Sequence, residues 1–252
     1  MAVLGALEFP PVSHLFVWDE WGPLGFNKVT LVMLFSTVLT LGLFLLGGRR
    51  RALVPTGVQN LAETGYELVE RSIGEEVMGH AGRRWAAFLC SFFFFIFFCN
   101  IFSVIPPIQF PATSRFGLTL LLAIITYVVM IAVGIAHGGL SWLKATLFPP
   151  GVPKALYFLV TPIEFVSKFL VRPFSLAVRL FANMVAGHVL LTVSALMCAA
   201  LWQAKWNVIF LPGPLFLGIA MTAFEVLVAV LQAYIFTILT AVYIGGAQHP
   251  EH

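Results

Sequence analysis

Long runs of apolar residues, separated by short polar connections, mark the first half of the chain. Three of these runs, 29–46, 85–105 and 117–136, hold 18 to 21 residues each. A helix of about 20 apolar residues is long enough to cross a hydrocarbon core about 30 Å thick. The pattern therefore predicts three conventional membrane-spanning helices.

The segment 58–77, between the first two runs, follows another pattern. Apolar residues recur at helical spacing, and acidic residues occupy the other faces: Val58, Leu61, Leu68, Val69, Ile73 and Val77 against Glu63, Glu67 and Glu70. This pattern is typical of an amphipathic helix at a membrane surface. Two interpretations stay open, a simple connection between two spans or a surface that contacts a partner. The acidic face disfavours anionic lipid and so favours a protein partner.

Two much longer apolar stretches, 155–201 and 213–244, fill the second half. As helices they would measure about 70 Å and 48 Å, well beyond the thickness of a hydrocarbon core. We expect two long, strongly tilted helices that form a hairpin around the turn at 202–214. The predicted fold is an all-α integral membrane protein in which 1–252 form a single membrane domain with five membrane-crossing helices and one amphipathic surface helix.

Composition excludes the main soluble classes. The chain is 60% hydrophobic and 10% charged, whereas soluble domains carry about 25% charged residues. Its net charge of +3 is too small to indicate nucleic acid as a partner. Three cysteines cannot build a disulfide framework, and the chain has no P-loop, zinc-protease motif or dinucleotide-binding glycine signature. We expect no catalytic site, cofactor or metal in this chain.

Basic residues in the loops predict the orientation, because cytoplasmic loops carry an excess of Lys and Arg. Eight fall on one side of the predicted spans and three on the other: Arg49, Arg50, Arg51, Arg71, Arg83, Arg84, Lys144 and Lys154 against Lys28, Arg115 and Lys205. The N-terminus should therefore lie outside and the C-terminus in the cytoplasm. Segment 1–28 is then expected to be an outer N-terminal segment. It lacks the basic start of a signal peptide, so it is not expected to be a removable signal.

Four charged residues stand inside the apolar stretch 155–201, where each basic residue costs about 2.5–3.5 kcal/mol at mid-membrane. Counted on an ideal α-helix, they form one polar stripe with a neighbouring amide: Glu164, Lys168, Arg172, Arg179 and Asn183. An internal ladder of ion pairs is one explanation for the first three. Arg179 lies deeper and has no acidic residue within a turn. It therefore needs an anion from another helix or another subunit.

Further polar residues mark the two long stretches. Glu225, Gln232 and Tyr243 are spaced to lie on one face of the last helix, and His188 is predicted at the same depth as Glu225. Titratable and polar groups inside a membrane are the expected lining of an ion or proton path. The alternative for His188 is a hydrogen-bonded core histidine. His137 and His188 could also ligate haem, although they lie on different spans.

Three motifs carry a resemblance to a known family. They are the run from Arg172 to His188, RPFSLAVRLFANMVAGH; Phe224-Glu225 through Leu231-Gln232-Ala233-Tyr234-Ile235-Phe236, followed by Tyr243; and Asn100 followed by Ile105-Pro106-Pro107. With them the chain resembles subunit a of rotary F-type ATP synthases, the stator half of the proton channel. The resemblance covers nearly the whole chain from Asn27 onward.

The resemblance implies roles for eight residues in proton translocation. Arg179 would face the carboxylates of a ring of c subunits, and His188 and Glu225 would form the imidazole and carboxylate pair of the outer path. Polar residues of that path or of the arginine's surroundings would be Asn100, Gln232, Asn183 and Tyr243, and Glu164 would mark the inner exit. Ser103 stands where some relatives carry a carboxylate, so an acidic role does not transfer to it.

The resemblance also implies the setting. The expected partners are the c-subunit ring, the b subunits of the peripheral stalk near 58–77, the rest of the F-type ATP synthase and the lipid bilayer. A bacterial inner membrane is favoured over a mitochondrial one. Two other functions are compatible with such a chain: a stand-alone secondary transporter, which would need an acid for Arg179 within the chain and usually a repeat, and a membrane anchor of a redox complex.

Overall fold

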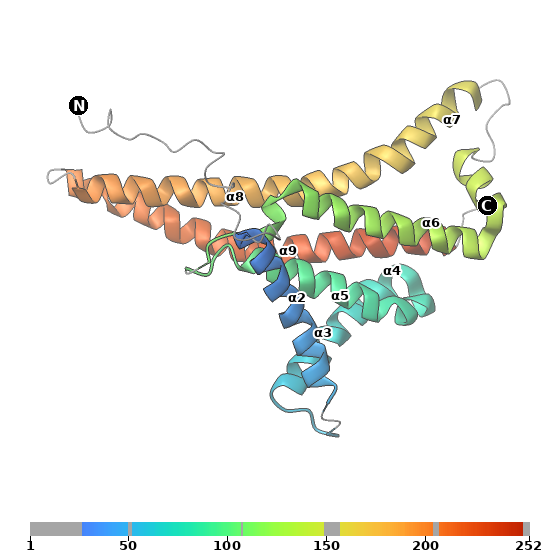
Figure 1. Ribbon diagram of the computed structural model, residues 1–252, viewed down its shortest axis with the longest axis horizontal. Helices are drawn as coiled ribbons and strands as arrows, with labels where there is room; N and C mark the ends of the chain where they lie inside the picture. Colours follow the sequence, from blue (N-terminus) through green and yellow to red (C-terminus); the bar gives the residue numbers. More distant parts are fainter. Residues whose placement is uncertain (1–26, 50–51, 107, 149–156, 204–206, 249–252) are drawn as a thin grey trace.

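The computed structural model describes residues 27–49, 52–106, 108–148, 157–203 and 207–248. The expected outer segment 1–28 lies outside the described residues, except for its last two. Within the described part of the chain every regular element is a helix (Figure 1). The first, α2, spans Lys28–Gly47, and Asn27 caps it because its Oδ1 accepts a hydrogen bond of 3.0 Å from the Thr30 N–H.

The amphipathic segment forms α3 (Val58–Val69), a π-helical turn η2 (Glu70–Glu75) and the short α4 (Glu76–Met78). A 3₁₀ turn, η3 (Gly79–Ala81), leads into α5 (Gly82–Ile101). The π-helical turn η2 packs tightly on α5 because Gly74 and Gly82 have no side chains where the two backbones meet. A Cβ atom on Gly82 would overlap the carbonyl oxygen of Gly74. Helix α3 buries one face against α2 and α5 and leaves Leu61 and Leu68 exposed.

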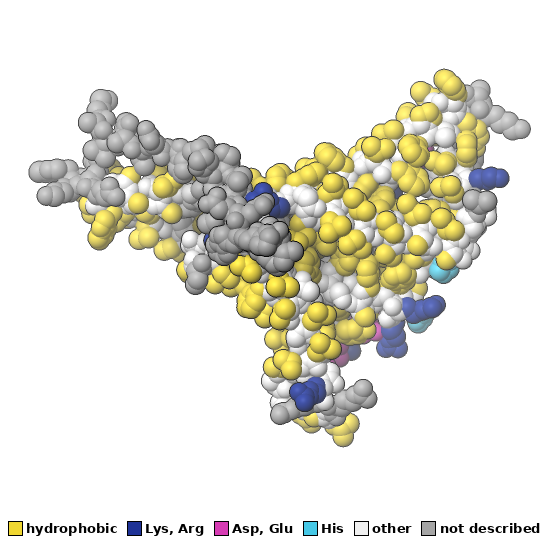
Figure 2. All heavy atoms as spheres, viewed as in Figure 1, with side chains coloured by type: hydrophobic (Ala, Val, Ile, Leu, Met, Phe, Trp, Pro, Cys, Tyr) yellow, Lys and Arg dark blue, Asp and Glu magenta, His cyan; other side chains and the backbone are white. Residues whose placement is uncertain are grey.

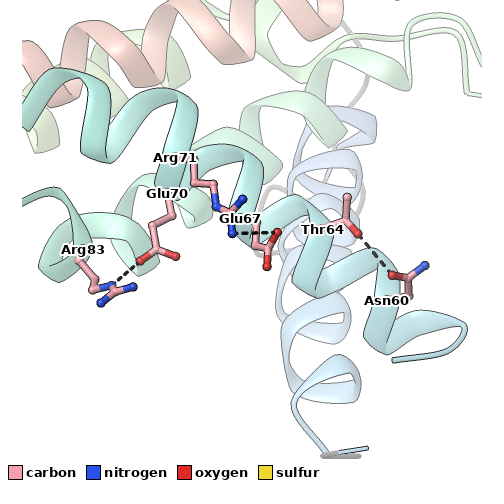
Figure 3. Close-up of polar contacts among 6 residues, drawn as sticks. All are labelled: Asn60, Thr64, Glu67, Glu70, Arg71 and Arg83. Carbon is pink, nitrogen blue, oxygen red and sulfur yellow. Dashed lines mark hydrogen bonds and ion pairs between the residues drawn. The ribbon is translucent and has the colours of Figure 1, made fainter. Parts of the chain in front are cut away.

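Acidic and basic side chains pair on the polar side of this segment (Figure 3). Arg83 Nε lies 3.0 Å from Glu70 Oε1, and Arg71 Nη2 lies 3.8 Å from Glu67 Oε2. Exposed pairs of this kind contribute about 0–1 kcal/mol each. They therefore keep this face polar and add little to the stability of the helix.

A short 3₁₀ turn, η4 (Ala112–Ser114), precedes α6 (Phe116–Leu147). This helix breaks at Gly139, whose φ of 57° and ψ of −146° suit a residue without a Cβ atom. Beyond the break the chain turns back on the helix, because the Trp142 ring fills the space where Gly134 and Gly138 have no side chain.

The second half begins with α7 (Tyr157–Phe165), which continues through a π-helical turn η6 (Val166–Val171) into α8 (Arg172–Gln203). A 3₁₀ turn, η7 (Asn207–Phe210), then leads to α9 (Pro212–Gln248). Helices α8 and α9 run side by side as a long hairpin, and α2 lies at a steep angle to both (Figure 1). The axis of α2 and the axis of the hairpin therefore cannot both be parallel to the membrane normal. This difference agrees with the expectation that the hairpin is tilted.

The prediction of an all-α membrane protein is confirmed. Among the described residues, five helical stretches are long and apolar enough to cross a membrane: Lys28–Gly47, Val58–Ile101, Phe116–Gly139, Tyr157–Trp202 and Val208–Gln248. Helix α9 packs against α5, α6 and α8, and the buried core lies among these helices. Apolar side chains also cover much of the outer surface in the view of Figure 2, as expected for a protein surrounded by lipid.

The prediction of one continuous polar stripe is wrong. It assumed 100° per residue from Glu164 to Asn183, but η6 is π-helical and has more residues per turn than an α-helix. The Lys168 side chain is directed to α6, where its Nζ donates to the carbonyl oxygen of Thr146 at 2.9 Å. Arg179 is exposed on α8 instead. The two ends of the predicted stripe therefore have different surroundings.

Candidate functional site

A cavity of about 540 Å³ lies between the end of α5 and the α8–α9 hairpin, on the side where the hairpin turns. Its wall is largely apolar, with polar side chains at intervals: Ser103, Gln109, His188, Thr192, Ser194 and Thr222. The volume is large enough for several water molecules, each of which occupies about 30 Å³ in the liquid. The cavity can therefore bring water and protons to the groups beside it.

Glu225 lies beside this cavity, about one helical turn along α9 from Thr222. Its side chain is only 5% exposed, and its Oε2 has no hydrogen-bond partner among the described residues. The Ser103 side chain, which lines the cavity, lies near the carboxyl group. A buried carboxyl group with one unpartnered oxygen can accept and release a proton where water reaches it.

Gly187 makes room for this carboxyl group. A Cβ atom on Gly187 would lie 2.7 Å from Glu225 Oε1 and 3.2 Å from Glu225 Cγ, so the carboxyl group packs directly on the α8 backbone. His188 follows Gly187, lines the cavity and stacks edge-on against Phe110 at 6.1 Å between ring centres. The structure thus brings His188 and Glu225 to the same region, as the sequence predicts.

Replacing Gly187 by alanine should displace the Glu225 carboxyl group, because the new methyl group occupies its place, and should slow several-fold the proton flux that the resemblance implies. The measurement is passive proton conductance of membranes from which the soluble, ATP-hydrolysing part of the complex has been removed. Gly42→Ala on α2 is the matched control, since a Cβ atom there meets nothing within 4 Å. Equal conductance in both variants would show that the position of this carboxyl group does not matter.

Asn100 and Gln232 lie in the core between α5 and α9. Asn100 is fully buried, and its Oδ1 accepts a hydrogen bond from the Thr113 hydroxyl group on η4. Its Nδ2 has no hydrogen-bond partner within the described part of the chain. Gln232 is 4% exposed and follows Glu225 by two turns. Both amides are therefore buried inside the protein.

Arg179 and Asn183 have a different environment, because both are exposed on α8. Exposed neighbours on this face are small: Ser175, Ala182 and Ala186. The Arg179 guanidinium group forms no ion pair or hydrogen bond with the other described residues. A positive charge with small neighbours leaves room for another helix to approach it closely.

A second polar cluster lies where η6 meets α6. Lys168 Nζ lies 2.9 Å from Glu164 Oε2, and the Tyr127 hydroxyl group donates to the carbonyl oxygen of Lys168 at 2.9 Å. Arg172 lies over the Tyr243 ring at 5.9 Å, and the rings of Tyr127 and Tyr243 are 5.7 Å apart. The internal ion pair foreseen as an alternative for Glu164 and Lys168 is present.

The two polar regions lie at opposite ends of the hairpin. Tyr243 belongs to the cluster around η6, and 18 residues of α9, about 27 Å of helix, separate it from Glu225. Arg179 lies between the two regions along α8, about 13 Å of helix from His188. The predicted site residues that the structure describes therefore form two separate groups, and the exposed Arg179 and Asn183 lie between them on α8.

Sequence reasoning missed four residues of these groups: Ser103, Thr113, Tyr127 and Gly187. The resemblance excludes only an acidic role for Ser103, whereas in the structure its side chain lines the cavity near Glu225. Gly187 directly precedes His188, and a glycine in a helix interior is a signal of close packing that could have been used. Thr113 and Tyr127 gave no local signal, because their partners lie 13 and 41 residues away.

Comparison with known proteins agrees with these features. Residues 30–245 match the family described as ATP synthase A chain. ATP synthase subunit a of Frankia alni is 41% identical over 252 residues, covering 96% of this chain and 87% of that protein. The protein of the same name from Parafrankia is 44% identical, and the match covers 94% of this chain and 82% of that protein. The one from Rhodococcus erythropolis is 40% identical, and the match covers 100% of this chain and 94% of that protein. The chain therefore belongs to the ATP synthase subunit a family.

Proposed function

We propose that this protein translocates protons as subunit a of a rotary F-type ATP synthase. It would provide two offset half-channels and the arginine that faces the carboxylates of the c-subunit ring. One observation carries the proposal: Arg179 is an exposed cation on a membrane helix, between polar groups at opposite ends of the same hairpin. A guanidinium group keeps its charge in proteins, so in lipid it requires an anion from a partner.

The cavity at the hairpin turn would form the outer half-channel. With the N-terminus outside and five crossings, the α8–α9 turn lies on the outer side of a bacterial inner membrane. Protons would pass through the cavity to His188, Ser103 and Glu225, with the Asn100 amide nearby. From there a proton would neutralise a carboxylate on the neighbouring c subunit. The neutral group could then rotate through lipid, because the large cost of burying a charge is removed.

The cluster around Glu164 would form the inner half-channel. A c-subunit carboxylic acid that arrives there would release its proton, since the nearby charge of Arg179 favours the ionised form. The same charge would oppose direct passage of a proton between the half-channels. Each proton that crosses delivers about 2.3 kcal/mol per 100 mV of membrane potential. The amphipathic segment α3–α4 would contact the b subunits through its exposed side.

A cross-linking experiment tests which face meets the rotor. Asn183→Cys should form a disulfide with a cysteine placed beside the carboxylate of the c subunit, because Asn183 is exposed one turn from Arg179. Val38→Cys on α2 is the matched control, since Val38 is 55% exposed but lies on a different membrane helix. If Val38→Cys cross-links as well as Asn183→Cys, or if neither does so in assembled complexes, the proposed rotor surface is wrong.

A further inference from the structure

The π-helical turn η6 leaves one backbone carbonyl group without a backbone donor. The Arg172 N–H donates to the carbonyl oxygen of Ser167, five residues earlier, as in a π-helix. The next donor in this series, to the carbonyl oxygen of Lys168, would be the N–H of residue 173. That residue is Pro173, which has no N–H. The Lys168 carbonyl group therefore loses both its α-helical and its π-helical partner.

Tyr127 supplies the missing hydrogen bond. Its hydroxyl group donates to the carbonyl oxygen of Lys168 at 2.9 Å, from α6 and across 41 residues of sequence. The Tyr127 side chain is 6% exposed, so water does not readily replace it. In a membrane protein an unsatisfied backbone group is costly because lipid offers no donor. The Lys168 side chain makes a second link to α6 through Thr146.

The register of η6 determines where Arg179 points. A π-helical turn holds one residue more per hydrogen-bonded ring than an α-helical turn. Return to a continuous α-helix would rotate α8 by about 100° relative to α7. In such a continuous helix, two placements could not hold at the same time: Glu164 and Lys168 against α6, and Arg179 and Asn183 on the exposed face. The two half-channels and the arginine thus depend on the same turn.

We infer that Tyr127 is a positioning residue for proton translocation: its hydroxyl group holds the Lys168 carbonyl group of the π-helical turn and thereby sets the rotation of the helix that carries Arg179. The inference rests on the proposed function. It adds to that function a residue of the cluster around Glu164 that lies outside the cavity at the hairpin turn and on a different helix from Arg179. It also gives Pro173 a role, because Pro173 creates the need for Tyr127.

The test removes only the hydroxyl group. In assembled complexes, Tyr127→Phe should lower ATP-driven proton pumping about fivefold and lower the yield of the Asn183→Cys cross-link to the c subunit. Tyr66→Phe on the surface helix is the matched control and should pump normally. The amount of complex in the membrane is measured for each variant, so that a loss of assembly is not mistaken for a loss of positioning.

Pro173→Ala separates positioning from packing, because alanine returns a backbone N–H that can bind the Lys168 carbonyl group. In the Pro173→Ala background, Tyr127→Phe should change pumping less than twofold and leave the cross-link yield unchanged. Normal pumping and cross-linking in Tyr127→Phe alone, or the same defect in both backgrounds, overturns the inference. If the parent complex gives no Asn183→Cys cross-link, or if Arg179→Ala pumps normally, the proposed function fails instead.

Discussion

Replacing Arg179 by alanine should abolish ATP-driven proton pumping, with no acidification of inverted membrane vesicles above background. The soluble head, once detached, should still hydrolyse ATP at the normal rate. The reason is that Arg179 is the cation exposed between the two polar regions of the hairpin. Without it, a c-subunit carboxylate would lose the charge that favours its ionised form. The measurement is dye-reported acidification of the vesicles, together with ATP hydrolysis after the head is released.

Two further variants make this result specific. Arg83→Ala removes an exposed cation whose pair with Glu70 contributes little, and it should pump at the normal rate. Arg179→Lys should pump poorly, because an ammonium group can lose its proton when buried whereas a guanidinium group keeps it. Normal pumping in Arg179→Ala would refute the assignment of the arginine.

Glu225→Gln should lower passive proton conductance by roughly tenfold or more, since positioned acid–base groups typically accelerate proton transfer by about 10²–10⁴-fold. Glutamine keeps the size of the side chain, so the close packing on Gly187 is preserved. It cannot carry a titrating proton, however. The measurement is the decay of an imposed potential in vesicles stripped of the soluble head.

Glu67→Gln is the control for this change. Glu67 is a surface carboxylate that is 60% exposed and pairs with Arg71 at 3.8 Å, so the substitution should leave conductance unchanged. Conductance in Glu225→Gln equal to that of the parent would remove Glu225 from the proton path. A loss of conductance in both variants would point to defective assembly, which the amount of complex in the membrane would reveal.

Much of the fold could be predicted from the sequence because hydrophobic runs and membrane thickness leave few choices. The helices α2, α5 and α9 follow apolar runs. The hairpin had to be tilted because its helices are longer than a bilayer is thick. Arg179 was also visible, since an unpaired cation within an apolar run is costly wherever the chain folds.

The missing parts depend on contacts between distant residues. The π-helical turn η6 has no periodic signature, and Pro173 alone predicts a kink. Only the packing of α6 shows that Tyr127 replaces the lost donor. The break at Gly139 likewise depends on a positive φ angle and on the Trp142 ring beneath it. Counting residues on an ideal helix failed at η6 because tertiary hydrogen bonds changed the local geometry.

The most apolar parts of the hairpin are little buried within their own chain, although other parts of α9 lie in the core. In the most apolar window of Tyr157–Trp202, 11% of residues are buried, and the share is the same for Val208–Gln248. A newly inserted copy that has not met its partners therefore displays this surface, with a guanidinium group on it, to every protein in the bilayer. Assembly with the proposed rotor would cover this surface, so only a copy without partners would leave it open to other membrane proteins.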